Sequence, residues 1–364
     1  MSRARNISLV LCFAAILAAP TVASIFHLNP FGAIDEKRVL AKKPEGLRWR
    51  WDSLGKVPAV TQAWEKYFDE NFGFRKLLIG TYRLASVQLL RISPTRPVVL
   101  GLSDGERRWL YFDAGVTGDG GGLESILGQK PYRPAELAAI AERLKQVTAL
   151  VRAKGANLVI AVCPDKQTIY PEYLPPAKRP GPGAASRLDQ FWAMASTLDS
   201  VPLVDLRTPL RQAKSQKQLY YPSDTHWNWH AGILAYLAIA RVLEAQDPSR
   251  TALPVERLQW RLGPPRVGDL TTLLGLPAIG GDRDWLPVLS DLAAHAGVKR
   301  GKVLIIADSF FQFIEPFFEM QFESVTSRYV TRGTREALLA PGLLDAEKPD
   351  VVILESVERY WTME

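Results

Sequence analysis

Val303-Leu-Ile-Ile-Ala-Asp-Ser-Phe-Phe311 is the stretch of sequence that decides the fold. The unbroken apolar run from Val303 to Ala307 is typical of a strand buried on both faces of a parallel sheet. Asp308 and Ser309 follow at its carboxyl end, the edge at which open α/β folds build their sites. Ser309 is therefore a candidate nucleophile, and a helix beginning there would offer free amides to an oxyanion. Asp-Ser after a strand also suits a simple helix cap, and this alternative stays open.

A second cluster of polar residues lies upstream, in Tyr220-Tyr-Pro-Ser-Asp-Thr-His-Trp-Asn-Trp-His-Ala-Gly232. An Asp two residues before a His on an extended segment projects to the same side. Asp224 can therefore hydrogen-bond the imidazole of His226 and fix its tautomer. His226 can then take a proton from Ser309, and the three residues form a candidate Ser-His-Asp triad.

Two other interpretations of this cluster stay open. In the first, Asp224 or Thr225 caps the following helix and His226 lies in its first turn. The second is a metal site, because His226 and His230 are four residues apart and can share a helical face near Asp224. No further His or Cys supports such a site, so the sequence predicts no bound metal.

From Pro134 onward, predicted helices alternate with short apolar strands. The helices are predicted at 134–154, 184–198 and 230–245, with a short one before the last strand. The strands are predicted at 157–162, 202–205, 302–307, 324–330 and 350–355, and a loop-rich insertion at 248–295. This alternation predicts a mostly parallel sheet covered by helices on both faces.

The N-terminal 26 residues have the layout of an export signal. Arg3 and Arg5 precede an uncharged apolar run from Ile7 to Phe26, which at about 1.5 Å per residue is long enough to span a bilayer. Thr21-Val22-Ala23 offers small residues for a cleavage site. Residues 1–26 are therefore predicted to be a signal peptide or a transmembrane anchor, and the chain is predicted to leave the cytoplasm.

The rest of the chain divides into two predicted regions. Residues 27–96 form a membrane-proximal helical region, with helices over 57–90 broken near Asn71 and Gly73. Residues 97–364 form the catalytic domain, which opens with a hairpin at 97–112 whose turn is Asp104-Gly105.

Composition excludes several classes of protein. The 364 residues are 47% hydrophobic, enough for one substantial core. The net charge of +7 is spread along the chain without a long basic run, so no nucleic-acid partner is predicted. The two cysteines, Cys12 and Cys163, both lie in apolar stretches, so no disulfide framework is expected.

The two polar clusters together resemble a known family. Asp-Thr-His-Trp-Asn at 224–228, upstream of a strand that ends in Asp-Ser-Phe at 308–310, resembles the periplasmic alginate O-acetyltransferases of the AlgJ and AlgX kind. In that family the Asp-x-His pair precedes the serine, as it does here. Segments 101–112, 162–175, 268–270 and 355–359 also resemble family elements, so the resemblance covers roughly residues 30–364.

This resemblance implies a fold, an activity and partners. The fold is a three-layer α/β/α domain similar to a rearranged SGNH hydrolase. The activity is acetyl transfer through Ser309 to hydroxyls of an exopolysaccharide, alginate-like or an acetylated cellulose. The implied partner is a membrane-bound O-acyltransferase that supplies acetyl groups, so no cofactor is expected on the chain itself. The implied location is the periplasm, with the N-terminal segment tethered to the inner membrane.

Further residues are expected at the site, although the sequence patterns that point to them are less specific. The Ser309 amide, Gly268 and the Asn228 side chain are candidate oxyanion donors. Lys166, in the segment that resembles Pro-x-Lys-x-x-x-Tyr-Pro, is a candidate substrate residue or a solvated loop lysine. Arg328 and Tyr329 follow a strand near the same edge of the sheet. They are expected either to contact substrate or simply to pack against the fold. Glu358 and Arg359 are expected to form an ordinary ion pair.

Two rival functions stay open. A carbohydrate acetylesterase would use the same triad with water in place of the sugar. A non-catalytic scaffold for exopolysaccharide assembly would require that Ser309, His226 and Asp224 lie apart. A separation between Ser309 Oγ and the His226 ring well beyond about 5 Å would favour the scaffold.

Overall fold

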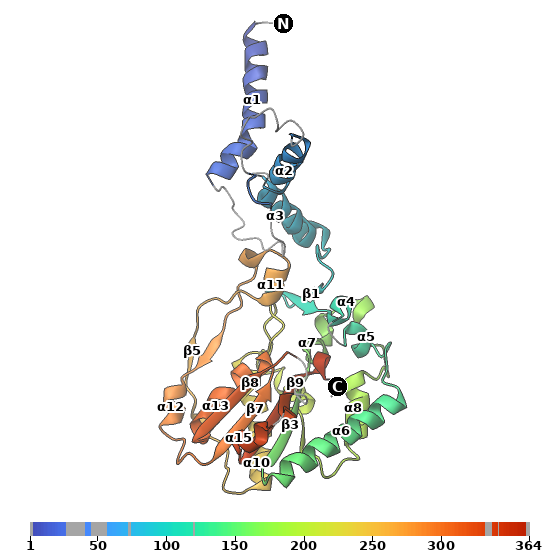
Figure 1. Ribbon diagram of the computed structural model, residues 1–364, viewed down its shortest axis with the longest axis vertical. Helices are drawn as coiled ribbons and strands as arrows, with labels where there is room; N and C mark the ends of the chain where they lie inside the picture. The colour runs from blue at the N-terminus through green and yellow to red at the C-terminus, as the bar shows by residue number, and fades with distance from the viewer. Residues whose placement is uncertain are drawn as a thin grey trace. The chain divides into compact units, whose positions relative to one another are not determined.

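The computed structural model describes residues 3–26, 41–44, 57–71, 74–118, 121–331, 337–340 and 342–361 (Figure 1). The chain divides into two compact units. The first consists of Met1–Pro94 together with Thr271–Ile279, and the second of Thr95–Leu270 together with Gly280–Glu364.

Helices make up most of the described part of the first unit's N-terminal segment. They are α1 (Arg3–Ile25), α2 (Val57–Glu70) and α3 (Arg75–Ala85), which continues as a π-helical turn at Ser86–Leu90. The predicted helices over 57–90 are confirmed, while Gly73, at the predicted break, lies outside the described residues. Within the described residues, no helix combines the length and apolarity needed to cross a membrane. The membrane anchor therefore stays a prediction.

A five-stranded parallel sheet forms the centre of the second unit. Its strands are β3 (Asn157–Cys163), β4 (Leu203–Asp205), β7 (Lys302–Ala307), β8 (Ser324–Tyr329) and β9 (Val351–Val357). They lie in the order β4-β3-β9-β7-β8, and every pairing between them is parallel. Each strand begins and ends within two residues of its predicted position.

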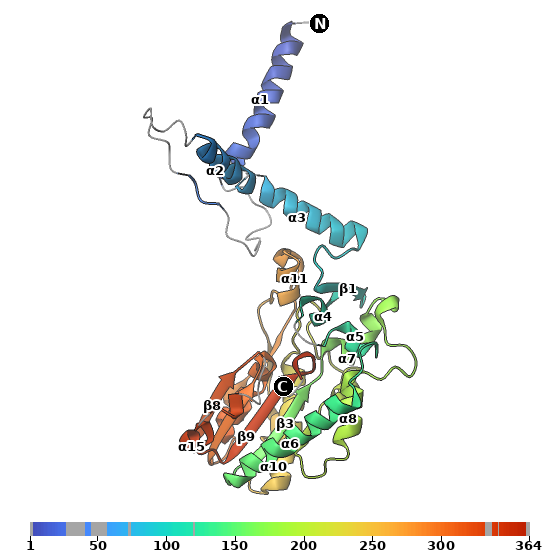
Figure 2. The same ribbon diagram turned by 45° about the vertical axis from the view of Figure 1, so that its right-hand side comes forward.

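Helices cover both faces of this sheet because alternate strand residues point to opposite sides. On β3, Val159 and Ala161 belong to the apolar cluster that includes α10 (Trp229–Gln246). Leu158 and Ile160 belong to the opposite cluster, with α6 (Pro134–Ala153) and α8 (Arg187–Ala195). Figures 1 and 2 show α6 and α8 beside each other, along the sheet. The predicted α/β fold with a parallel sheet and two helical layers is confirmed.

The loops that build the candidate site leave one edge of the sheet. Strands β3, β9 and β7 are parallel neighbours, so their carboxyl ends lie side by side. The loops that begin at residues 164, 308 and 358 therefore start at the same edge, where open α/β sheets bind ligands.

Two further pairs of strands in this unit are antiparallel. In the first, β1 (Val98–Ser103) pairs with β2 (Arg108–Phe112), as predicted, and Gly105 takes a φ of +105° in the turn. In the second, β5 (Trp260–Leu262) pairs with β6 (Trp285–Pro287). This second pair of strands was expected to be loop, because strands of three residues are too short to show a period in the sequence.

The remaining helices are short. They are α4 (Ala114–Thr117), α5 (Leu123–Ile126), α7 (Lys166–Ile169), α9 (Arg207–Ala213), α11 (Asp269–Leu273), α12 (Leu289–Ala293), α13 (Glu315–Gln321) and α15 (Leu343–Glu347). Of these, α15 is the short helix predicted before the last strand.

Candidate active site

Ser309 stands at the first position of a 3₁₀ turn, Ser309–Phe313, directly after β7. The preceding residue, Asp308, caps this turn, because its side chain accepts a hydrogen bond of 2.9 Å from the amide of Phe310. Asp308 is buried and Ser309 is exposed. The capping alternative therefore applies to Asp308, and the Ser309 hydroxyl is left open to a reaction partner.

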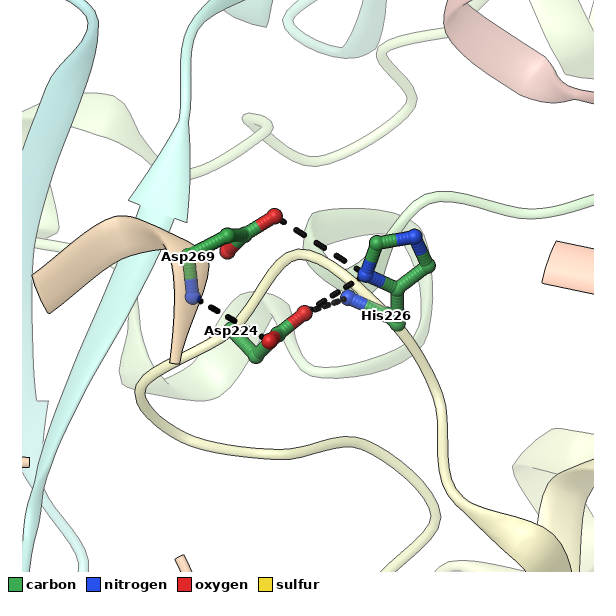
Figure 3. A group of neighbouring side chains, drawn as sticks. All are labelled: Asp224, His226 and Asp269. Carbon is green, nitrogen blue, oxygen red and sulfur yellow. Dashed lines mark hydrogen bonds and ion pairs between the residues drawn. The ribbon is translucent and has the colours of Figure 1, made fainter. Parts of the chain in front are cut away.

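The structure brings Ser309, His226 and Asp224 together. His226 Nε2 lies 2.7 Å from Ser309 Oγ, and His226 Nδ1 lies 2.6 Å from Asp224 Oδ1. The backbone amide of His226 also donates to Asp224 Oδ1, at 2.9 Å, and Figure 3 shows both contacts between these two residues. Each ring nitrogen of His226 thus has one partner, a serine hydroxyl at Nε2 and a carboxylate at Nδ1. This is the arrangement of a nucleophile, a general base and an acid that orients the base. The separation that would have favoured a scaffold is not found.

The loop that carries His226 is held against the Ser309 turn by its neighbour Trp227. Tyr220 and Trp227 form an antiparallel bridge, so the segment between them closes into a tight loop. Trp227 is fully buried, and its indole N–H donates a 2.9 Å hydrogen bond to the carbonyl of Phe310. Because side chains alternate along an extended segment, Trp227 enters the core while His226 faces Ser309.

Asp224 is held in its charged form by its surroundings. It is buried, and burial alone would raise its pKa, but the hydrogen bond and charge of His226 and the charge of Arg266 outweigh this and hold its pKa below the ordinary value. Arg266 Nη2 lies 3.2 Å from Asp224 Oδ2, and the amide of Asp269 donates to the same oxygen at 3.1 Å. Asp224 is therefore an anion with a fixed orientation.

A second carboxylate, Asp269, lies beside the triad and was not expected there. Its oxygens accept hydrogen bonds from the amide and the hydroxyl of Thr225, at 2.7 and 2.5 Å. Its Oδ2 is 3.8 Å from His226 Nδ1 (Figure 3). The sequence could not place this contact, because Asp269 lies in the long insertion, far from His226 along the chain.

Asp224, His226 and Asp269 also form a group of a kind that can hold a metal ion, with one ligand atom from each within 4.8 Å of the others. Arg266 and Thr225, however, already bind the two carboxylates. A bound cation would compete with both and meet the positive charge of Arg266. His230, the second ligand of the metal alternative, is not in this group.

Lys166 is buried beneath the loop that carries Asp224, so the solvated alternative is wrong. Its ammonium donates to the backbone carbonyls of Tyr221, Pro222 and Asp224, at 3.0, 3.2 and 2.6 Å. Burial lowers the pKa of Lys166 to about 8, although the charges of Asp269 and Asp224 oppose this shift. A lysine ammonium has three N–H donors, and here each has a carbonyl acceptor.

Asn228 and Gly268, the candidate oxyanion residues besides Ser309, both have structural roles. Asn228 caps α10, with its side-chain oxygen accepting from the amide of His230 at 3.1 Å and its amide group donating to the carbonyl of Gln218 at 2.7 Å. Gly268 packs its backbone against Ser223, and a Cβ there would lie 2.0 Å from the Ser223 carbonyl oxygen. Both residues therefore shape the loops around the triad.

Arg328 and Tyr329 lie on the edge strand β8. Arg328 is half-exposed and pairs with Glu347 at 3.8 Å. The Tyr329 hydroxyl donates to Glu315 at 2.6 Å. Tyr329 is level with Ala307, two residues before Ser309, which puts it at the same edge of the sheet as the triad.

The expected ion pair between Glu358 and Arg359 is wrong. Arg359 instead pairs with buried Asp165. Glu358 accepts from the amide of Asp165 at 2.9 Å and from the hydroxyl of Thr168 at 2.7 Å. Adjacent residues in a 3₁₀ turn point in different directions, so each of these two side chains has its partners in the segment Asp165–Thr168 that follows β3.

Comparison with known proteins gives consistent matches. The family described as the SGNH hydrolase-like domain of acetyltransferase AlgX matches residues 102–302, more than half of the chain. The probable alginate O-acetylase AlgJ of Pseudomonas fluorescens is 28% identical over 222 residues, 59% of this chain and 50% of that protein. AlgJ of Azotobacter vinelandii is 24% identical over 295 residues, 81% of this chain and 67% of that protein.

One solved structure supports the fold. The O-acetyltransferase domain of Pseudomonas putida AlgJ is similar with a TM-score of 0.51 and 23% identity, covering 74% of this chain and 94% of that domain. The chain spans about half the length of most of the curated relatives it matches.

Proposed function

Because the chain belongs to the family of the SGNH hydrolase-like domain of acetyltransferase AlgX, we propose that it transfers acetyl groups to the hydroxyls of an exopolysaccharide. The observation that carries this proposal is the hydrogen-bonded line from Ser309 through His226 to Asp224, with distances of 2.7 and 2.6 Å. The names of the curated relatives, alginate O-acetylases, support acetyl transfer as the reaction.

In the first step, Ser309 Oγ attacks the carbonyl carbon of an acetyl donor. His226 Nε2 takes the hydroxyl proton as the C–O bond forms, and Asp224 stabilises the resulting imidazolium through Nδ1. When the tetrahedral intermediate collapses, the bond to the donor's leaving group breaks and His226 returns the proton to that group. The product of this step is an acetyl ester on Ser309.

In the second step, His226 takes the proton of a sugar hydroxyl, whose oxygen attacks the acetyl carbon. Collapse of this second intermediate breaks the ester bond to Ser309, and His226 gives its proton back to Ser309 Oγ. The acetyl group then resides on the sugar, and the triad returns to its starting state.

We assign the backbone amide of Ser309 as one oxyanion donor. The next two amides of the turn, those of Phe310 and Phe311, already donate to the side chain and the carbonyl of Asp308. The Ser309 amide donates none of the backbone hydrogen bonds found among the described residues. It lies on the nucleophilic residue itself, next to the position where the oxyanion would form.

The proposal extends to location and partners. The basic residues and apolar run of 1–26 support export to the periplasm as a signal peptide or membrane anchor. A membrane-bound O-acyltransferase would then present the acetyl group. The sequence offers no coenzyme A or nucleotide motif with which the chain could obtain acetyl groups alone.

The experiment is to incubate the full chain with an aryl acetate and a defined oligosaccharide, and to measure acetylated sugar and free acetate separately. The proposal expects acetylated sugar that disappears with Ser309→Ala. Release of acetate without any acetylated sugar would instead make the protein an acetylesterase with the same triad.

A further inference from the structure

A buried acid, Glu355, contacts the residue before the nucleophile and has no role in the mechanism above. It belongs to β9, which lies between β3 and β7 in the sheet, and its side chain is fully buried. An acidic side chain is rarely buried to this extent unless partners compensate for the loss of water. The contacts of Glu355 therefore indicate what it does.

Glu355 and Asp308 connect β9 to the end of β7 through two hydrogen bonds that run in opposite directions. The backbone amide of Asp308 donates to Glu355 Oε2 at 3.0 Å. In return, the backbone amide of Val357 donates to Asp308 Oδ2 at 2.7 Å. Asp308 is thus held through both its backbone and its side chain, at the point where the chain leaves β7.

The position of Ser309 depends on this connection. The ladder between β7 and β9 ends at Ile306. Two residues later, the Glu355 side chain accepts the backbone amide of Asp308 and so continues the attachment of the chain to β9. Ser309 is the next residue, and its Oγ lies 2.7 Å from His226 Nε2. Movement of the Asp308 backbone would therefore change the separation between the nucleophile and the base.

The two carboxyl groups differ in how their charge is satisfied. Asp308 accepts amide hydrogen bonds on both of its oxygens, from Val357 and Phe310, which favours its charged form. Glu355 accepts one amide, and its Oε1 has no hydrogen-bond partner among the described residues. Burial raises the pKa of both groups, and the charge of Asp308 raises that of Glu355 further. Glu355 is therefore the protonated member of the pair.

We propose that Glu355 is a positioning residue for the nucleophile, because its carboxyl group holds the backbone of Asp308 and thereby keeps Ser309 Oγ within reach of His226. The inference rests on the proposed function, since it concerns how fast Ser309 is acetylated. Glu355 is fully buried, so it acts through Asp308 and not by contact with the donor or the sugar.

Three substitutions separate the features of Glu355 on which the proposal depends. Glu355→Gln keeps the length of the side chain and an oxygen that can accept the Asp308 amide. Glu355→Asp keeps the acid but is one methylene too short to reach that amide. Glu355→Leu removes the acceptor, so the Asp308 amide is left buried without a partner.

The test is the rate of Ser309 acetylation by an aryl acetate, measured on the full chain by stopped flow over a range of ester concentrations. Glu355→Leu and Glu355→Asp should each lower kcat by about 10²-fold, the effect that a displacement of about 1 Å can cause, and change KM for the ester less than about twofold. Glu355→Gln should retain kcat to within about threefold, because the hydrogen bond is kept.

Thr148→Val is the matched control. It also removes a buried hydrogen bond, of 2.8 Å to the carbonyl of Leu144, but it lies on α6, which supplies no residue of the site. It should leave kcat unchanged to within about twofold. Circular dichroism melting curves check that each variant is folded. Because Glu355→Leu and Glu355→Asp lose the same contact in different ways, either one alone decides if the other does not fold.

Three results would overturn the inference: a wild-type rate in Glu355→Leu or Glu355→Asp, a loss in Glu355→Gln as large as that in Glu355→Leu, or a loss confined to KM. The proposed function fails in a different way, through acetylation of wild-type Ser309 without transfer to a sugar. That result would leave the comparison among the Glu355 variants intact, so the two proposals can fail independently.

Discussion

The ammonium of Lys166 donates a 2.6 Å hydrogen bond to the carbonyl oxygen of Asp224. Lys166 begins the helix after β3, and Asp224 is the acid whose carboxylate lies 2.6 Å from His226 Nδ1. One buried side chain thus ties the edge of the central sheet to the backbone of the loop that carries Asp224 and His226. Lys166 is a positioning residue, because its contacts are with the loop and not with the reacting atoms.

Replacing Lys166 with Met should slow acetyl transfer by about 10²-fold, the size of effect that a displacement of about 1 Å can cause. The loss should appear in kcat, with little change in KM for the aryl acetate, because the loop around Asp224 shifts while the donor contacts stay. Steady-state kinetics check this. A change confined to KM would mean that Lys166 contacts the donor.

The same variant should alter how stability depends on pH. Burial lowers the pKa of Lys166 in the folded chain to about 8, from 10.5. Between these values the unfolded chain holds a proton that the folded chain has released, so the free energy of unfolding of the wild type rises with pH relative to Lys166→Met. Urea unfolding from pH 7 to 10.5 measures this, with exposed Lys145→Met as the control. Parallel curves for wild type and Lys166→Met would contradict it.

The two acids beside His226 should differ sharply in their effect on catalysis. Asp224→Asn should lower the rate of Ser309 acetylation by about 10⁴-fold, because the amide favours the wrong imidazole tautomer. Asp269→Asn should cost far less, because Asp269 Oδ2 is 3.8 Å from Nδ1 and mainly binds Thr225. Stopped-flow measurement of aryl acetate cleavage compares them. Equal losses would show that the two acids orient His226 jointly.

Gly268 is a position at which a single methyl group should be harmful. A Cβ there would meet the Ser223 carbonyl oxygen at 2.0 Å, so Gly268→Ala should lower the free energy of unfolding by about 1–3 kcal/mol. At Gly181, where a Cβ meets no heavy atom within 4 Å, Ala should cost nothing or stabilise slightly. Thermal unfolding of the two variants gives the comparison, and equal melting temperatures would refute the steric argument.

The parallel sheet was predictable because its central strands β3, β7 and β9 contain continuous apolar runs. The apolar run from Val303 to Ala307 was enough to predict the strand before Ser309. The contact between Asp224 and His226 was predicted from their spacing of two residues. Both are local features, and local patterns are what a single sequence displays.

The rest of the site depends on contacts between distant parts of the chain. Arg266 and Asp269 come from the insertion, and no spacing rule connects them to Asp224. Lys166 was predicted as a candidate site residue. Its burial under the loop could not be predicted from the residues next to it in the sequence, because its hydrogen-bond partners lie more than 50 positions away. Asn228 could have been recognised as a cap, because Asn directly before an apolar helix is a common N-cap.

The measurement that tests the central claim most directly is mass spectrometry of the intact chain after brief exposure to an aryl acetate, followed by peptide mapping. The account predicts one added acetyl group on Ser309, absent in Ser309→Ala and lost when an acceptor oligosaccharide is added. An acetyl group on another residue, or equal labelling of Ser309→Ala, would contradict it.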